Sequence, residues 1–410
     1  MPNNLIYIPN NFKTMIQRAV LKEITKRASE ERKFIQVLAG PRQVGKTTLV
    51  RQLIQQTDIP CHFVTADDLY AADSTWLRRE WGNARFQLQQ NDRKEMLFIV
   101  DEVQKVPNWS EIVKKEWDSD SFSDINVKVI LLGSSRLLIQ KGLTESLAGR
   151  YELTNITHWS FDEMRDAFGW NLEQYIYFGG YPGSASLIPD EERWKDYIRE
   201  SLVETTISKD ILMMARVDKP ALLKRLFDIG CRYSSQILSL NKVQGELQES
   251  GNLTTLSGYL DLLKGAGLLS GLEKYAADII RKRASKPKFQ VHNNALLAAG
   301  QNKTFDMLRK DSKEWGRFVE SAVGTHLINS GLKHRFNVYY WNQGNYEVDY
   351  VIEKGGEIIA IEVKSGKNSA NIGLSLFDKE FQPHGLYLIG TDGIPLEQFF
   401  TMNPGDLFKM

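Results

Sequence analysis

The stretch GPRQVGKTT, residues 40 to 48, constrains the fold of this chain more than any other segment. It has the spacing G-x-x-x-x-G-K-T, follows the apolar run FIQVLA and opens the helix-forming sequence KTTLVRQLIQQ. In that context two glycines let backbone amides curl around phosphate groups at the N-terminus of a helix. The segment therefore predicts a phosphate-binding loop between a buried strand and a helix.

The predicted loop gives its polar residues definite roles. Lys46 is expected to reach the β- and γ-phosphates of a nucleotide, and the Thr47 hydroxyl is expected to coordinate magnesium. We expect the nucleotide to be ATP, bound with Mg²⁺. The loop residues predicted to contact it are Gly40, Pro41, Arg42, Gln43, Val44, Gly45, Lys46, Thr47 and Thr48.

Four apolar segments that end in glycine or polar residues predict a parallel sheet with helices on both faces. They are FIQVLAG, CHFVTADD, MLFIVDE and VKVILLGSS. The third places Asp101 and Glu102 at the carboxyl end of its strand, where open α/β sheets bind ligands. Asp101 is expected to hold magnesium, and Glu102 to orient or deprotonate the attacking water. An Asp-Glu pair can also cap a helix, but beside GPRQVGKTT the functional interpretation is favoured.

The end of the fourth strand offers groups that could respond to the γ-phosphate. Ser135 is expected to contact the nucleotide, although Ser134 is equally available and both could simply begin a loop. Two arginines, Arg136 and Arg150, both qualify as the positive charge that stabilises phosphoryl transfer, and Arg150 is also expected among the nucleotide contacts. Such an arginine often comes from a neighbouring subunit, and for each a surface ion pair is the alternative.

These motifs, together with FIVDEVQKVPNW, LLGSS, SLAGRYEL and GGYPGSAS in the same order, resemble a family of prokaryotic AAA-superfamily ATPases. The resemblance covers nearly the whole chain. It implies an AAA-like, additional-strand P-loop sheet, a helical middle with a winged-helix segment, and a C-terminal α/β domain similar to restriction endonucleases. We accordingly expect an ATPase core over residues 1–160, a lid and winged helix over 161–300, and the nuclease-like domain over 301–410.

Residues 238 to 275 predict short helices followed by a strand pair, as in a winged helix. Its third helix offers only one base-reading cation, Lys264, so it is poor for reading DNA sequence. The run IIRKRASKPK, residues 279 to 288, is basic and could lie against phosphates as a wing. The alternative is a solvated hairpin.

The C-terminal sequence YEVDYVIEKGGEIIAIEVKSG resembles the PD-(D/E)xK nuclease fold, with valine in place of the motif's proline. Alternation along the second strand sends Glu362 and Lys364 to one face, and Asp349 can lie beside Glu362 if the strands pair. Asp349 and Glu362 are expected to hold magnesium, while Lys364 stabilises charge and the helix residue Glu320 completes the site. Either this centre cuts nucleic acid, or the domain keeps the strands only for binding and assembly.

Composition limits the remaining choices. The net charge of +1 gives no general attraction for nucleic acid, so such a contact needs a local patch. Cys61 and Cys231 match no metal-binding spacing. We expect a cytoplasmic protein without a membrane span, which forms a homo-oligomer or binds a protein partner or nucleic acid. Three functions compete: an ATP-hydrolysing switch or motor, an ATP-regulated nuclease, and a scaffold that does not cut.

Overall fold

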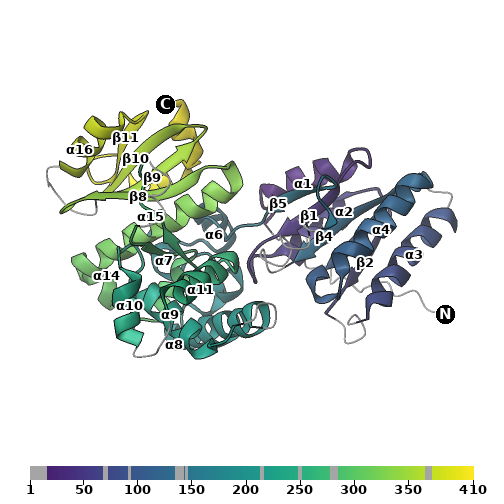
Figure 1. Ribbon diagram of the computed structural model, residues 1–410, viewed down its shortest axis with the longest axis horizontal. Helices are drawn as coiled ribbons and strands as arrows, with labels where there is room; N and C mark the ends of the chain where they lie inside the picture. The colour runs from purple at the N-terminus through teal and green to yellow at the C-terminus, as the bar shows by residue number, and fades with distance from the viewer. Residues whose placement is uncertain are drawn as a thin grey trace.

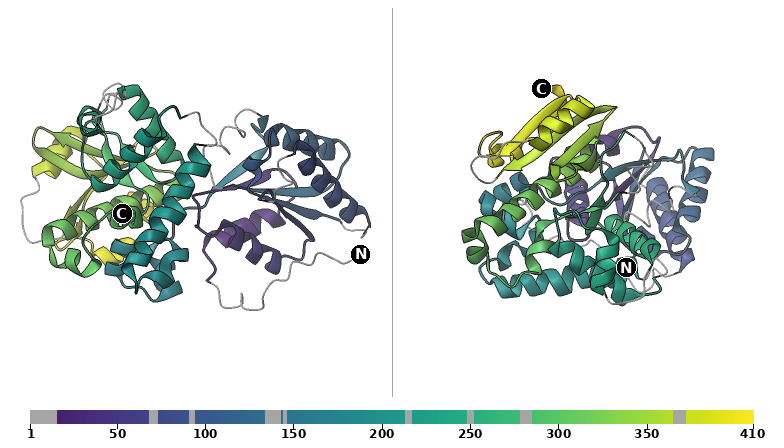
Figure 2. Two further views of the ribbon diagram at one scale, coloured as in Figure 1. Left: turned by 90° about the horizontal axis from the view of Figure 1, so that it is seen from below. Right: turned by 60° about the vertical axis from the view of Figure 1, so that its left-hand side comes forward.

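The computed structural model describes residues 16–67, 73–90, 94–133, 143, 146–212, 217–247, 252–277, 285–364 and 372–410. Figures 1 and 2 show two lobes. The first, from α1 to β5, contains the phosphate-loop sequence. The second contains everything after β5, including the C-terminal sheet. Residues 156–160 connect the two lobes.

The sheet of the first lobe is parallel, as the apolar segments predict. Its five strands lie in the order β2-β3-β4-β1-β5, with β4 inserted between the loop-bearing strand β1 and β3. The insertion agrees with the additional-strand sheet implied by the resemblance. The strands are β1 Ile35–Ala39, β2 Cys61–Thr65, β3 Met96–Asp101, β4 Val127–Gly133 and β5 Tyr151–Asn155.

Helices cover both faces of this sheet, which explains why β1, β3 and β4 are buried along their whole length. Alternate strand residues such as Val37 and Val100 pack under α3 (Ser74–Gln90) and α4 (Trp109–Phe122). Their neighbours Leu38 and Ile99 pack under α1 (Val20–Ser29) and α2 (Lys46–Gln56). Such two-sided burial removes most of the apolar surface from water and is the main stabilising contribution.

The second lobe begins with helical segments that hold the GGYPG turn. They are α6 Phe161–Phe168, α7 Leu172–Phe178, η4 Pro182–Leu187, α8 Glu191–Asp196, η5 Tyr197–Glu204 and η6 Thr206–Ile211. Both η5 and η6 are π-helical. The sequence predicts helix here but not π-helix, a rare form that often occurs at functional sites.

Residues 238–275 contain two helices and one strand: α10 Leu240–Leu247, α11 Leu253–Gly265 and β6 Leu269–Leu272. The helix α9 (Pro220–Arg232) precedes this range, and the antiparallel partner of β6, β7 (Lys288–Val291), follows it. Arg281, Lys282 and Arg283 lie outside the described residues. Lys288, the last cation of the basic run, is fully buried. Neither a phosphate contact nor a solvated hairpin therefore describes this residue.

The C-terminal region contains a four-stranded mixed sheet in the order β11-β10-β9-β8, in which β10 and β11 are parallel. Its elements are α13 Asn294–Ala299, α14 Phe305–Lys310, α15 Ser312–His334, β8 Asn337–Gln343, β9 Tyr346–Lys354, β10 Glu357–Lys364, α16 Ile372–Phe381, β11 Gly385–Gly390, α17 Leu396–Thr401 and η7 Pro404–Lys409. Ile359 and Ile361 face α15, while Ile358 and Ala360 face α16. One apolar core runs from Phe161 to Leu407, so packing is continuous across the domain boundary expected near residue 300.

None of the helices in the described part of the chain combines the length and apolar character that crossing a bilayer requires.

Candidate functional site

The segment between β1 and α2 forms a tight loop whose shape depends on its two glycines. Gly45 adopts the left-handed conformation (φ 86°) just before α2, where other residues would be strained. Gly40 lies directly against the backbone of Ile156, and a side chain there would collide with it. The loop therefore presents its backbone to the start of α2, as phosphate binding requires.

Lys46, Thr47 and Asp101 meet at this loop. The Thr47 hydroxyl donates to Asp101 Oδ2 at 2.7 Å, and Asp101 is 5% exposed. The Lys46 ammonium donates to the carbonyls of Gly40 (3.0 Å) and Pro41 (2.8 Å), and burial lowers the pKa of Lys46. The carboxyl end of β3 thus lies beside the loop, as predicted from the two sequence motifs.

Glu102 follows Asp101 in a left-handed conformation (φ 53°) that turns the chain away from β3. Its amide donates to Asp101 Oδ1 (3.0 Å), and its carboxylate accepts from Gln104 (2.6 Å). Positive φ in a residue that is not glycine is costly and is found often at functional sites.

The Thr47 hydroxyl and Asp101 carboxylate fit a magnesium ion that also binds phosphate and water, because Mg²⁺ favours one or two protein oxygens plus substrate oxygens. Among the described residues no group of three or more His, Cys, Asp or Glu side chains is gathered to hold a metal ion. A magnesium ion at the loop would therefore depend on the nucleotide for further ligands.

Residues from both lobes and from the connecting segment contact the loop directly. Trp159 Nε1 donates to the Val44 carbonyl at 3.1 Å, and Arg18 NH1 donates to the same carbonyl at 3.0 Å. Pro41 packs against Gly267 at the end of α11. These contacts make the shape of the loop depend on residues far from it in the sequence.

The tightest of these contacts is an ion pair between the loop and η6. Arg42 donates to Asp210 through Nε (2.6 Å) and NH2 (2.5 Å). Asp210 is almost fully buried, and its hydrogen bond raises the pKa of Arg42. The sequence predicts Arg42 as a nucleotide contact, whereas here its guanidinium is bound to the second lobe.

A cavity of about 440 Å³ lies beside the loop and the first turns of α2. Thr48 and Gln52 of α2 and Trp159, Phe168 and Pro182 from after β5 are among its lining residues. Its size and its mixture of aromatic and polar groups are those of a small-molecule site. Thr48 is predicted from the sequence as a nucleotide contact. Trp159 and Phe168, which follow the last strand of the sheet, are not predicted.

The residues proposed to respond to the γ-phosphate are placed differently. Ser134, Ser135 and Arg136 lie outside the described residues. Arg150 precedes β5, and its carbonyl accepts from the amide of Ile35 at the start of β1. The phosphate loop follows the opposite end of β1. Arg150 therefore lies at the far edge of the sheet, away from the phosphate loop of the same chain. It forms an ion pair with Asp118 (2.8 Å).

The C-terminal sheet brings Asp349, Glu362 and Lys364 together. The β9–β10 register ends with Ile361 opposite Tyr350, so Glu362 and Asp349 follow on adjacent strands. Asp349 Oδ2 accepts from the Val363 amide (2.8 Å), and Lys364 donates to Glu362 Oε1 (2.7 Å). Burial, then the nearby Asp349, raise the pKa of Glu362 to about 7.

Glu320 lies in the same region and forms an ion pair with Lys288, the last cation of the predicted basic wing. Lys288, from β7, contacts Glu320 (2.8 Å) and Glu347 (3.0 Å). Burial raises the pKa of Glu320 to about 8, although Lys288 opposes this shift. In the strand KFQV the polar residues Lys288 and Gln290 alternate with Phe289 and Val291, which is the one local signal that a polar face is present.

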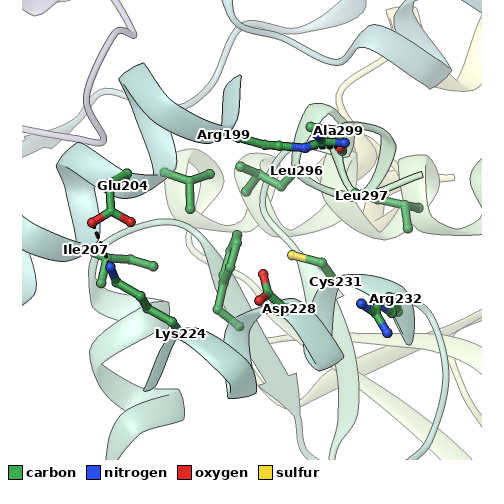
Figure 3. Close-up of a pocket in the computed structure, with 13 residues that line it drawn as sticks. Arg199, Glu204, Ile207, Lys224, Asp228, Cys231, Arg232, Leu296, Leu297 and Ala299 are labelled. Atoms are coloured by element: carbon green, nitrogen blue, oxygen red, sulfur yellow. Dashed lines mark hydrogen bonds and ion pairs between the residues drawn. The ribbon is translucent and has the colours of Figure 1, made fainter. Parts of the chain in front are cut away.

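A separate cavity of about 270 Å³ lies in the second lobe, between η5–η6, α9 and α13 (Figure 3). Two cations in its wall already have partners in the wall. Lys224 pairs with Glu204 at 2.7 Å, and Arg199 donates to the Ala299 carbonyl at 2.6 Å. These pairs compete with any phosphate, so we place the nucleotide at the loop.

Comparison with known families divides the chain into three matches. Residues 32–165 match the model of an AAA domain, residues 169–306 match a domain of unknown function (DUF8612), and residues 315–398 match another (DUF4143). The first match agrees with the strand order and the loop geometry. The first lobe therefore resembles an AAA domain in its sequence, its strand order and the geometry of its loop.

Relatives span several prokaryotic lineages. An uncharacterized protein of Haemophilus influenzae is 24% identical over 349 residues, covering 80% of this chain and 82% of the relative. Uncharacterized protein Rv2008c of Mycobacterium tuberculosis is 24% identical over 380 residues, covering 90% and 80%. Uncharacterized protein MJ1544 of Methanocaldococcus jannaschii is 25% identical, covering 78% and 72%.

Among solved structures, the Walker-type ATPase PABY2304 of Pyrococcus abyssi matches with a TM-score of 0.46 and 14% identity, over 68% of this chain and 94% of that one. The ORC1 protein of Aeropyrum pernix, solved in complex with DNA, matches with a TM-score of 0.34 and 12% identity, over 73% and 96%.

Proposed function

We propose that this chain binds and hydrolyses ATP with Mg²⁺ at residues 40–48, and that the second lobe responds to the nucleotide state. The observation that carries the proposal is the meeting of Lys46, Thr47 and Asp101 at one loop. Phosphate release from ATP by the full chain, compared with a Lys46→Ala chain, tests the catalytic part.

Phosphoryl transfer requires the protein mainly to position the reactants and to stabilise negative charge. Magnesium, when bound, supplies charge neutralisation on the phosphates, and Thr47 and Asp101 would hold it. Lys46 would exchange its two carbonyl partners for phosphate oxygens, which its short distance from the loop backbone allows. Glu102, at the strand end, would orient the attacking water and accept its proton.

The cavity beside α2 would receive the base and ribose. Trp159 and Phe168 provide aromatic surface for a planar base, while Thr48 and Gln52 provide polar groups. The same Trp159 donates to the loop carbonyl of Val44. Trp159 would thus contact the base and also help to fix the shape of the phosphate loop.

The Arg42–Asp210 pair would transmit the nucleotide state. Arg42 belongs to the phosphate loop, and Asp210 belongs to the π-helical segment η6 of the second lobe. A phosphate at the loop would compete with Asp210 for the guanidinium, because both are anions suited to its fork-shaped donors. Loss of the pair would then release η6 from the loop.

Asp210→Asn tests this route while keeping the side-chain volume. It is expected to lower the free energy of unfolding by about 1–3 kcal/mol, because two charge-assisted hydrogen bonds to a buried group weaken. It is also expected to remove most of the ATP-dependent change in amide hydrogen exchange over residues 197–211. Denaturant unfolding and exchange mass spectrometry measure the two effects.

The matched control is Asp196→Asn, because Asp196 is an exposed aspartate in the preceding helix. That variant should keep both the stability and the exchange response of the wild type. Equal exchange responses in the Asp210→Asn and wild-type chains would show that the nucleotide state reaches η6 by another path.

A second candidate function is metal-dependent cleavage of nucleic acid by the C-terminal sheet. The specific observation in its favour is the pairing of Asp349 and Glu362 on adjacent strands, with Glu362 Oε2 buried and without a hydrogen-bond partner. Those two carboxylates fit one divalent cation, with Lys364 beside them. If the domain does not cut, the alternative is a binding role toward nucleic acid or a protein.

Glu362→Ala separates the two functions. It is expected to change ATP turnover by no more than about twofold, since distant sites act independently. Any magnesium-dependent degradation of plasmid, single-stranded DNA or RNA by the wild type should disappear. Gel assays with and without ATP measure this, and cleavage that persists in the variant would remove Glu362 from the proposed centre.

A further inference from the structure

Strand β7 presents two buried polar side chains to the C-terminal region. Lys288 and Gln290 are fully buried, and they alternate with Phe289 and Val291, which belong to the apolar core. Gln290 donates to the Ser321 carbonyl of α15 (2.8 Å) and accepts from the Tyr350 hydroxyl of β9 (2.9 Å). Buried polar groups of this kind require complete hydrogen bonding, so β7 is fitted to α15 and β9 specifically.

Lys288 has all the partners that a buried ammonium needs. Its Nζ contacts Glu320 Oε1 (2.8 Å) and Glu347 Oε1 (3.0 Å), and donates to the Asp349 carbonyl (3.1 Å). Asp349 Oδ1 lies at 3.8 Å, and the Tyr350 ring centre lies at 4.8 Å. The three N–H groups of the ammonium thus face three oxygen acceptors within about 3 Å. The Asp349 carboxylate and the Tyr350 ring lie slightly farther away.

We propose that Lys288 is the built-in cation of this C-terminal carboxylate cluster. Its Nζ lies within 4 Å of carboxylate oxygens of Glu320, Glu347 and Asp349, and it fixes β7 to α15 and β9. A divalent cation and the Lys288 ammonium therefore compete for the same oxygens.

Glu320 does not complete a three-carboxylate metal centre while Lys288 is in place. Glu320 is held by the lysine, which leaves Asp349 and Glu362 as a two-carboxylate remainder. The absence of any larger group of metal-binding side chains among the described residues agrees with this. Removing the lysine's charge would leave the carboxylates facing one another without compensation, which is unfavourable unless another cation binds.

Lys288→Met tests the inference in the full chain without nucleotide. The variant is expected to melt several degrees below the wild type, and millimolar Mn²⁺ should restore a large part of that loss while leaving the wild-type melting temperature almost unchanged. The exposed neighbour Lys286 gives the matched control, Lys286→Met, which should behave like the wild type. Adding Asp349→Asn to Lys288→Met should abolish the Mn²⁺ effect, which separates it from cation binding at the phosphate loop.

The double variant Lys288→Met/Glu320→Gln covers the case in which Lys288→Met does not fold. Removing one charge of each sign should recover soluble, cooperatively melting protein relative to the single variant. A wild-type melting temperature in Lys288→Met, equal Mn²⁺ stabilisation of wild type and variant, or no recovery in the double variant would each overturn the inference.

Discussion

Replacing Lys46 with alanine is expected to lower kcat/KM for ATP by about 100- to 1000-fold, the usual cost of removing one charge-stabilising donor from a reacting centre. Lys46 is buried next to the loop carbonyls and the Thr47–Asp101 pair, so no other described lysine can take its place. Steady-state phosphate release measures the effect.

The fold should survive this substitution. Burial lowers the pKa of Lys46, which means that the environment opposes its charge and that truncation removes an unfavourable term. Lys22→Ala, an exposed lysine on α1, is the matched control and should keep wild-type turnover. Loss of the cooperative melting transition in Lys46→Ala would mean that lost activity reports unfolding and not lost chemistry.

Glu102→Gln is expected to lower kcat by about 100- to 10,000-fold, the range for removal of a general base, with little change in ATP affinity. Glutamine keeps the size of the side chain and the strained turn at φ 53°, so the loop geometry should persist. Single-turnover hydrolysis and equilibrium binding of ATP measure the two quantities separately.

A fall in affinity with an unchanged rate would assign Glu102 to substrate binding instead. The control is Glu111→Gln, an exposed acidic residue in the first turn of α4, which should affect neither quantity.

The first lobe was predictable from sequence because its decisive features are local. The phosphate loop, its strand and its helix are consecutive, and the structure begins α2 at Lys46 as the motif requires. The Thr47–Asp101 contact follows from two parallel strands ending at the same edge of one sheet. The position of Arg150 was missed, because the strand that follows it, β5, was not among the four predicted strands.

Contacts between distant segments were not predictable in the same way. Arg42 and Asp210 are 168 positions apart, and nothing near Asp210 in the sequence distinguishes its π-helical turn from an ordinary helix. Lys288 was grouped with the surface cations of a basic run, because burial of one lysine depends on carboxylates contributed by α15 and β9. The motif residues Asp349 and Glu362 were found, whereas the buried cation that pairs with Glu320 and Glu347 was not.

The apolar core that continues across the expected domain boundary was also not predictable from the sequence. Apolar periodicity assigns helices and strands one at a time, but it does not say which elements share a core. Here the long helix α15 packs against both the helical middle and the C-terminal sheet. A response of η6 to nucleotide could therefore reach the C-terminal sheet through packed elements.

The most direct test of the central claim is magnesium-dependent phosphate release from ATP by the purified full chain, measured beside Lys46→Ala and Glu102→Gln. We expect wild-type turnover that requires magnesium and is lost in both variants. Wild-type protein that binds ATP without releasing phosphate, or turnover that survives both substitutions, would contradict the assignment of ATP hydrolysis to residues 40–48, Asp101 and Glu102.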